Sequence, residues 1–186
     1  MAVRILAVLF AFSMLLLALP AFADCTDEAC GAIQKILQAR SNNFAKLKGK
    51  PGTDPRGDAE WEGTQTIAGL INYCYVYKRG ENSRYEYRCD AAAMGRQAFL
   101  PLEKAKKIAE SVRAAFQSAD PKTVWFEDPA ARALASIDGF QGTEGWYGGD
   151  AKTKLIAKLE IVSSGSDGHT VSVSVFASPL SRRDLK

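Results

Sequence analysis

The single histidine is the residue that a serine–histidine–aspartate triad would have to use. His169 follows Asp167 by two residues, and Ser166 lies beside that aspartate. The Gly-Ser-Asp-Gly segment at 165–168 departs by one residue from the Gly-x-Ser-x-Gly elbow that carries such a nucleophile. A histidine just after an Asp-Gly turn is more often a solvated loop residue than a general base. We therefore expect no catalytic residue here.

Carboxylates offer the other acid–base chemistry. Glu144 and Asp150 could serve a glycoside hydrolase as a pair, although a chain with 21 acidic residues contains many such pairs by chance. One histidine cannot form a histidine-rich zinc site, and Glu127-Asp128 lacks the alternation of a calcium loop. Neither a Walker loop nor a dinucleotide-binding glycine motif occurs. We expect no metal and no cofactor.

Aromatic residues in a glycine-rich stretch give the clearest candidate for binding. Glycine recurs every third residue from Gly139 to Gly148, and Phe140, Trp146 and Tyr147 lie among the glycines. Such a stretch is typical of a mobile loop, and exposed Trp and Tyr side chains stack on sugars or insert into a partner's pocket. The alternative is that Trp146 packs into the core and the glycines only permit turns.

A tyrosine-rich hairpin gives a second candidate surface. The segment 71–90 is rich in aromatic and β-branched residues, with Gly-Glu-Asn-Ser at 80–83 as its turn. The two-residue period of a strand predicts one exposed face with Tyr73, Tyr75 and Tyr77, and one core face with Cys74, Val76, Tyr85, Tyr87 and Cys89. The alternatives are that a helix or strand covers the tyrosine face, or that it is an ordinary amphipathic sheet surface.

The first 23 residues have the pattern of a secretory signal peptide. Arg4 precedes an apolar run from Ile5 to Leu19, and Ala21-Phe22-Ala23 ends with the small residues of a cleavage site. We expect cleavage after Ala23 and a periplasmic or secreted protein. The run is short for a membrane anchor of about 20 residues, and nothing later is apolar enough to span a bilayer.

The mature chain of 163 residues (186 − 23) has a balanced charge. Without Arg4 it keeps 23 basic and 21 acidic residues, a net charge of +2 (23 − 21). That balance does not favour nucleic acid as a partner. All four cysteines follow the cleavage site, and an even number in an oxidising compartment indicates two disulfides.

Two disulfide pairings are favoured. If Glu81 and Asn82 form the centre of the hairpin turn, Cys74 lies opposite Cys89. Cys25–Cys30 would then close a short loop. The other connectivities stay open, because Cys30 falls on the apolar face of the following helix and could link that helix to the hairpin.

Two amphipathic helices and two groups of strands are expected to position these residues. Apolar periodicity predicts helices over 24–49 and 101–120, and strands over 61–67, both arms of 71–90, 152–161 and 171–175. Segments 50–58 and 122–129 are expected to be loops. The predicted fold is α+β: an antiparallel sheet of five to six strands in two meanders, with two main helices on one face, in the order α-βββ-α-βββ. Residues 24–178 would form one domain, and 179–186 a polar C-terminal tail.

These features together favour an exported, disulfide-stabilised, non-catalytic binding or accessory protein of the cell envelope, with a protein or glycan partner. One alternative is a small secreted hydrolase that uses a carboxylate pair or His169. Another is a chaperone-like holder of exported polypeptides, which requires a contiguous exposed apolar patch larger than roughly 600 Å².

Overall fold

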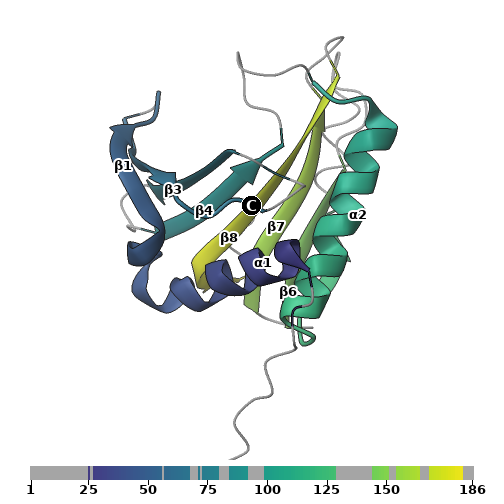
Figure 1. The fold of residues 1–186 in the computed structure, drawn as a ribbon, viewed down its shortest axis with the longest axis horizontal. Helices are drawn as coiled ribbons and strands as arrows, with labels where there is room; N and C mark the ends of the chain where they lie inside the picture. Colours follow the sequence, from purple (N-terminus) through teal and green to yellow (C-terminus); the bar gives the residue numbers. More distant parts are fainter. Residues whose placement is uncertain are drawn as a thin grey trace, which may run out of the picture.

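The computed structural model describes residues 25, 27–55, 57–67, 71, 73–79, 84–91, 99–128, 144–150, 154–163 and 168–181. Two helices lie on one face of an eight-stranded antiparallel sheet (Figure 1). The elements are α1 (Glu28–Gln38), β1 (Lys48–Thr53), β2 (Ala59–Gly63), β3 (Tyr73–Arg79), β4 (Arg84–Asp90), α2 (Leu102–Ala119), β5 (Val124–Glu127), β6 (Glu144–Asp150), β7 (Lys154–Ser163) and β8 (His169–Leu180). Two short 3-10 turns, Ala39–Asn42 and Ala45–Leu47, join α1 to β1.

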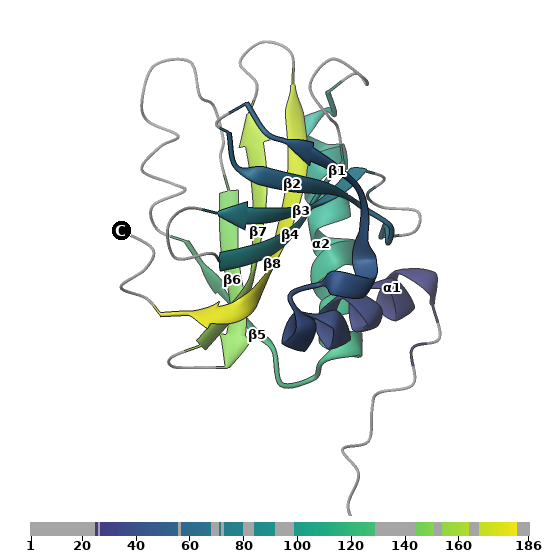
Figure 2. The same cartoon turned by 90° about the vertical axis from the view of Figure 1, so that its left-hand side faces the viewer.

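The sheet joins two similar halves, each of which is a helix followed by a four-stranded meander. The strand order is β1-β2-β3-β4-β8-β7-β6-β5, so the last strands of the two meanders, β4 and β8, pair in the middle. In Figure 2, β1 to β4 lie across the view, β6 and β7 lie upright and antiparallel to each other, and the long β8 bends between the two orientations. The predicted α+β class with two helices is therefore right, but the sheet is larger than the expected five to six strands.

The first helix is shorter than predicted. Asp27 caps its start by accepting a hydrogen bond from the Cys30 N–H at 2.6 Å. Helix α1 ends at Gln38, and the next residues cannot continue it because Asn43 and Phe44 adopt left-handed φ angles of 56° and 58°. The conformation at Phe44 places its ring, which is fully buried, 5.5 Å from the ring of Tyr87. Burial of the aromatic ring offsets the backbone strain.

Three strands lie where the sequence predicted loops or a tail. β1 extends over residues 50–53 of the predicted loop 50–58, and its irregular register between Lys48 and Pro51 accommodates a proline at the edge of the sheet. β5 occupies the predicted linker 122–129, held by an edge-on contact of 5.3 Å between Trp125 and Phe116. β8 runs on to Leu180 and so includes the start of the predicted tail. The predicted strand 61–67 is observed as β2, Ala59–Gly63, and beyond it Ile67 forms an isolated bridge with Ile71.

The core lies between the sheet and the helices. Buried apolar side chains of α1 and α2 pack against those on the helix-facing side of the sheet, and they include Ile33, Ile36, Val112, Phe116, Val76, Tyr87, Leu159, Ile161, Val171 and Val173. The Arg40 Nε–H donates a hydrogen bond of 2.6 Å to the Phe176 carbonyl and so ties the 3-10 turn that follows α1 to β8. Burial lowers the pKa of Arg40, and Asp120 opposes that effect.

Both predicted disulfides are present. Cys74 and Cys89 face each other across β3 and β4 with their Cα atoms 4.0 Å apart, and Cys25 is bonded to Cys30. The predicted register of the hairpin is confirmed, since Val76 lies opposite Tyr87 and Tyr75 opposite Arg88. No described helix is long and apolar enough to cross a membrane. The predicted signal peptide lies outside the described residues.

Replacing Cys74 and Cys89 together by alanine should lower the free energy of unfolding by about 2–4 kcal/mol, because the bond restricts the unfolded chain. Removing the Cys25–Cys30 bond should lower the free energy of unfolding by about 1 kcal/mol less than removing Cys74–Cys89. The reason is that a bond with a sequence separation of 5 restricts the unfolded chain less than one with a separation of 15. Urea unfolding measures both. Free thiols in the denatured, unreduced wild-type protein would contradict the disulfide assignment.

Candidate binding surface

The face of the sheet turned away from the helices, here called the outer face, carries a continuous row of charged, polar and aromatic residues. Paired residues run side by side across seven strands, from β2 to β5, in the order Glu62, Tyr75, Arg88, Ser174, Lys158, Tyr147 and Phe126. A parallel row two residues further along contains Tyr73, Asp90, Ser172, Glu160 and Gly145. Neither α1 nor α2 packs on this face (Figures 1 and 2).

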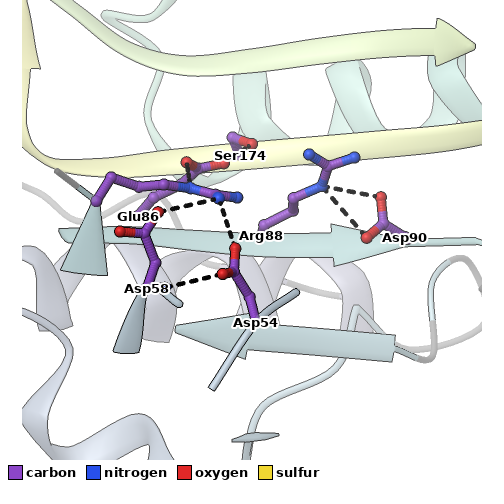
Figure 3. Close-up of polar contacts among 7 residues, drawn as sticks. Asp54, Asp58, Glu86, Arg88, Asp90 and Ser174 are labelled. Carbon is purple, nitrogen blue, oxygen red and sulfur yellow. Dashed lines mark hydrogen bonds and ion pairs between the residues drawn. The ribbon is translucent and has the colours of Figure 1, made fainter. Parts of the chain in front are cut away.

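Two matching ion pairs lie on either side of the central strand β8. On β4, the Arg88 Nε is 3.2 Å from an Asp90 carboxylate oxygen, as Figure 3 shows. On β7, the Lys158 Nζ is 2.6 Å from the Glu160 carboxylate. Both cations are opposite Ser174, and both acids are opposite Ser172.

The carboxylates keep both cations charged. Burial alone would lower the pKa of Arg88, but the charges of Asp90 and Glu86 outweigh it, so the pKa is raised. Burial likewise opposes the charge on Lys158, and its hydrogen bond and ion pair with Glu160 raise its pKa overall. The half-buried cations Arg88 and Lys158 therefore stay charged and paired with Asp90 and Glu160 on the outer face.

A second polar cluster is centred on Arg79, at the end of β3. Its guanidinium contacts Asp54 at 3.1 Å, Asp58 at 3.8 Å and Glu86 at 3.4 Å. Glu86 also accepts a hydrogen bond of 2.5 Å from the Ser174 hydroxyl, and the Asp58 N–H donates to Asp54 (Figure 3). These contacts tie the β1–β2 turn to β4 and to the central strand.

The tyrosine face of the hairpin is where the sequence predicted it. Tyr73, Tyr75 and Tyr77 are half-buried on the outer face, while Cys74, Val76, Tyr87 and Cys89 are buried on the helix side. The Tyr75 and Tyr77 rings are 6.0 Å apart, and the Arg79 guanidinium lies 4.1 Å from the Tyr77 ring. Burial and the neighbouring Glu60 raise the pKa of Tyr77 to about 12. Burial and the charge of Asp54 also raise the pKa of Glu60.

The predicted mobile aromatic loop is wrong for its second half. Trp146 and Tyr147 belong to β6, so as neighbours in a strand they point to opposite faces. Trp146 packs on the helix side, where the Arg113 guanidinium lies 4.6 Å from its ring, as the core alternative proposed. Tyr147 is buried on the outer face, with the Lys158 Nζ 5.5 Å from its ring. Phe140 lies outside the described residues.

The glycines of β6 serve close packing. A Cβ on Gly148 would lie 3.1 Å from the Trp125 ring, so the absence of a side chain lets Trp125 lie over the strand. A Cβ on Gly149 would lie 2.2 Å from the Lys154 carbonyl, at the irregular step between β6 and β7. A glycine-rich sequence is therefore compatible with an ordered strand here.

The acid–base candidates do not converge. Glu144 and Asp150 lie at opposite ends of β6, six residues or about 20 Å apart at roughly 3.3 Å per residue, which exceeds the spacing of a glycosidase pair. His169 begins β8, and its backbone pairs with Leu100. Neither nitrogen of its buried ring has a hydrogen-bond partner among the described residues.

One small pocket nevertheless contains acids. It has a volume of about 130 Å³ and is lined by Glu127, Asp128, Glu144, Gly145 and Trp146. Sites for small molecules usually exceed about 300 Å³. Glu144 pairs with Lys106 on α2 at 3.4 Å, whereas Asp128 accepts a hydrogen bond from the Tyr147 hydroxyl on the outer face. The two carboxylates are thus directed to opposite faces of the sheet.

Sequence reasoning missed the two ion pairs beside β8. The signal was present as a basic residue, an apolar residue and an acidic residue at 88–90 (Arg-Cys-Asp) and again at 158–160 (Lys-Leu-Glu). Alternation places the charges of each triplet on one face. The pairing of β4 and β7 with opposite edges of β8 could not be deduced from either triplet alone.

The shift at Tyr77 predicts a loss of stability in alkali. An unfolded tyrosine ionises near pH 10, and the folded Tyr77 near pH 12. Its contribution is therefore complete below pH 10 and is lost as the pH rises toward 12. In a pH titration followed by the absorbance of ionised tyrosine, Tyr77→Phe should reduce the absorbance change near pH 12, because the variant lacks this hydroxyl. Loss of amplitude near pH 10 instead would contradict the burial of this hydroxyl.

No family model, curated protein or solved structure matches this chain.

Proposed function

We propose that this chain is an exported, disulfide-stabilised, non-catalytic binding protein of the cell envelope, and that its outer face is the binding surface. The observation that carries the proposal is the row of paired residues across seven strands, on the face that neither α1 nor α2 covers. Two disulfides support export, because such bonds persist in oxidising compartments. The N-terminal pattern of residues 1–23 supports the same conclusion.

The dimensions of the row favour a protein partner. Six interstrand spacings of about 4.8 Å make it roughly 29 Å long, which is close to the edge, about 28 Å, of a square with the area of a standard interface, about 800 Å² per partner. Tyrosine and arginine, which dominate binding hot spots, line it at Tyr75 and Arg88. Small ligands and short glycans usually require concave sites, and the pocket described above is at the β5–β6 end of the sheet.

The chaperone-like alternative lacks support. Val124, with 44% of its surface exposed, is the one exposed large apolar side chain among the described residues. A holder of unfolded chains would need an extended apolar surface. The polar, ion-paired outer face instead suits a folded partner.

Site-specific cross-linking in the envelope tests the proposed surface. A photo-reactive amino acid replacing Tyr75 or Glu62 should form a protein adduct, because both positions are on the row. The same amino acid at Lys107, which is exposed on α2, is the matched control and should form none. Equal adducts at all three positions, or none, would contradict the proposal. If the adduct contains glycan and no protein, the partner is a glycan rather than a protein.

The acid-lined pocket is the observation that favours the hydrolase alternative. If the protein binds without catalysis, the purified wild type should release no reducing ends from envelope glycans. If it is a hydrolase, activity should be present and should be lost in Asp128→Asn and Glu144→Gln, which change two of the three acids of the pocket. Glu103→Gln, exposed on α2, is the control that should keep it.

A further inference from the structure

The charges at the centre of the outer face form an ordered array. Arg88 and Lys158 lie on either side of Ser174, and Asp90 and Glu160 on either side of Ser172. The two serines are two residues apart on β8, which separates the positive row from the negative row by about 6.6 Å. Paired residues on adjacent strands are about 5 Å apart, so each row spans about 10 Å.

The serines make a low floor between the charges. Ser172 is 2% exposed and Ser174 is 5% exposed, whereas the exposed fractions of the four charged side chains range from 18% for Asp90 to 34% for Arg88. A partner therefore meets the charged groups first. The Ser172 hydroxyl is buried and has no hydrogen-bond partner among the described residues, so a donor seated between Asp90 and Glu160 would also find an acceptor beneath it.

The four charges sum to zero, and the adjacent Glu86, which accepts a hydrogen bond from Ser174, is itself paired with Arg79, so the array selects by arrangement. A partner with charge of one sign would be attracted by one row and repelled by the other. A partner with a positive group over Ser172 and a negative group over Ser174 would be attracted by both rows. Charge arrangement of this kind contributes specificity more than raw affinity.

We propose that the partner of this protein docks through an exposed segment that carries one basic and one acidic side chain about 6–7 Å apart, with the basic group between Asp90 and Glu160 and the acidic group between Arg88 and Lys158. The inference rests on the proposed function and adds the chemistry of the partner. Residues four apart on a helix, or two apart in a strand, have this separation.

The test exchanges charges within an ion pair and keeps the pair itself. Lys158→Glu with Glu160→Lys reverses the β7 pair, and Arg88→Asp with Asp90→Arg reverses the β4 pair. Either exchange alone makes each row half positive and half negative, so a dipolar segment aligned along β8 loses its complement in both directions. Both exchanges together restore one positive and one negative row, with the direction reversed.

Phage-displayed random linear peptides, selected on the wild-type protein, are the probe. We expect selected peptides to be enriched in a basic and an acidic residue spaced four or two apart. Each single exchange should weaken their binding about tenfold, and the double exchange should restore it, because a free peptide can bind in the opposite direction. If the exchanges weakened binding by damaging the fold, the double exchange would bind more weakly than either single exchange. The melting temperature of each variant checks for such damage.

Lys106→Glu with Glu144→Lys is the matched control, since it exchanges an ion pair between α2 and β6 and should leave binding unchanged. Selected peptides without paired charges, or binding that is insensitive to the exchanges, would overturn the inference. If either result is found but the photo-reactive amino acid at position 75 still forms a protein adduct, the outer face remains the proposed binding surface and only the chemistry of the partner is wrong. Absence of that cross-link as well would overturn both.

Discussion

The double pairing of β8 is the constraint on which the rest of the structure depends. The segment from Ser172 to Phe176 pairs with β4, and Ser172 to Val175 pair at the same time with β7. Without this strand the two four-stranded meanders would have no common sheet. β8 contributes to both faces of the sheet. Val173 is buried under the helices in the core, and Ser174 lies between two cations on the outer face.

The two faces of β8 show how one strand serves stability and recognition together. Val171, Val173 and Val175 alternate with Ser172 and Ser174. The valines are buried against the helices, where apolar burial stabilises the fold. The serines are small enough to leave the neighbouring ion pairs standing above them. Larger residues at the serine positions would separate the charges on β4 from those on β7.

Short-range patterns predicted much of this fold. Cys74 and Cys89 are symmetric about a turn, which was enough to deduce the register of the hairpin and the face of its tyrosines. The alternation in β7 and β8 and the apolar stripe of α2 were equally local. Features that depend on distant residues were not predicted. The glycines of β6 alone indicate a mobile loop, whereas Gly148 makes room for the Trp125 ring from another strand. The candidate surface was half predicted for the same reason. The tyrosines come from one hairpin, but the charged rows also need β4 to pair with β8, and these two strands are far apart in the sequence.

The positions of the disulfides have a consequence for how the chain matures. Both bonds lie in the first half, between Cys25 and Cys89, and the cysteines pair in the order in which they occur. A chain that enters an oxidising compartment N-terminus first could therefore close each bond as soon as its second cysteine arrives. No earlier bond would need to be broken, so isomerisation of mispaired disulfides is not required before β8 completes the sheet.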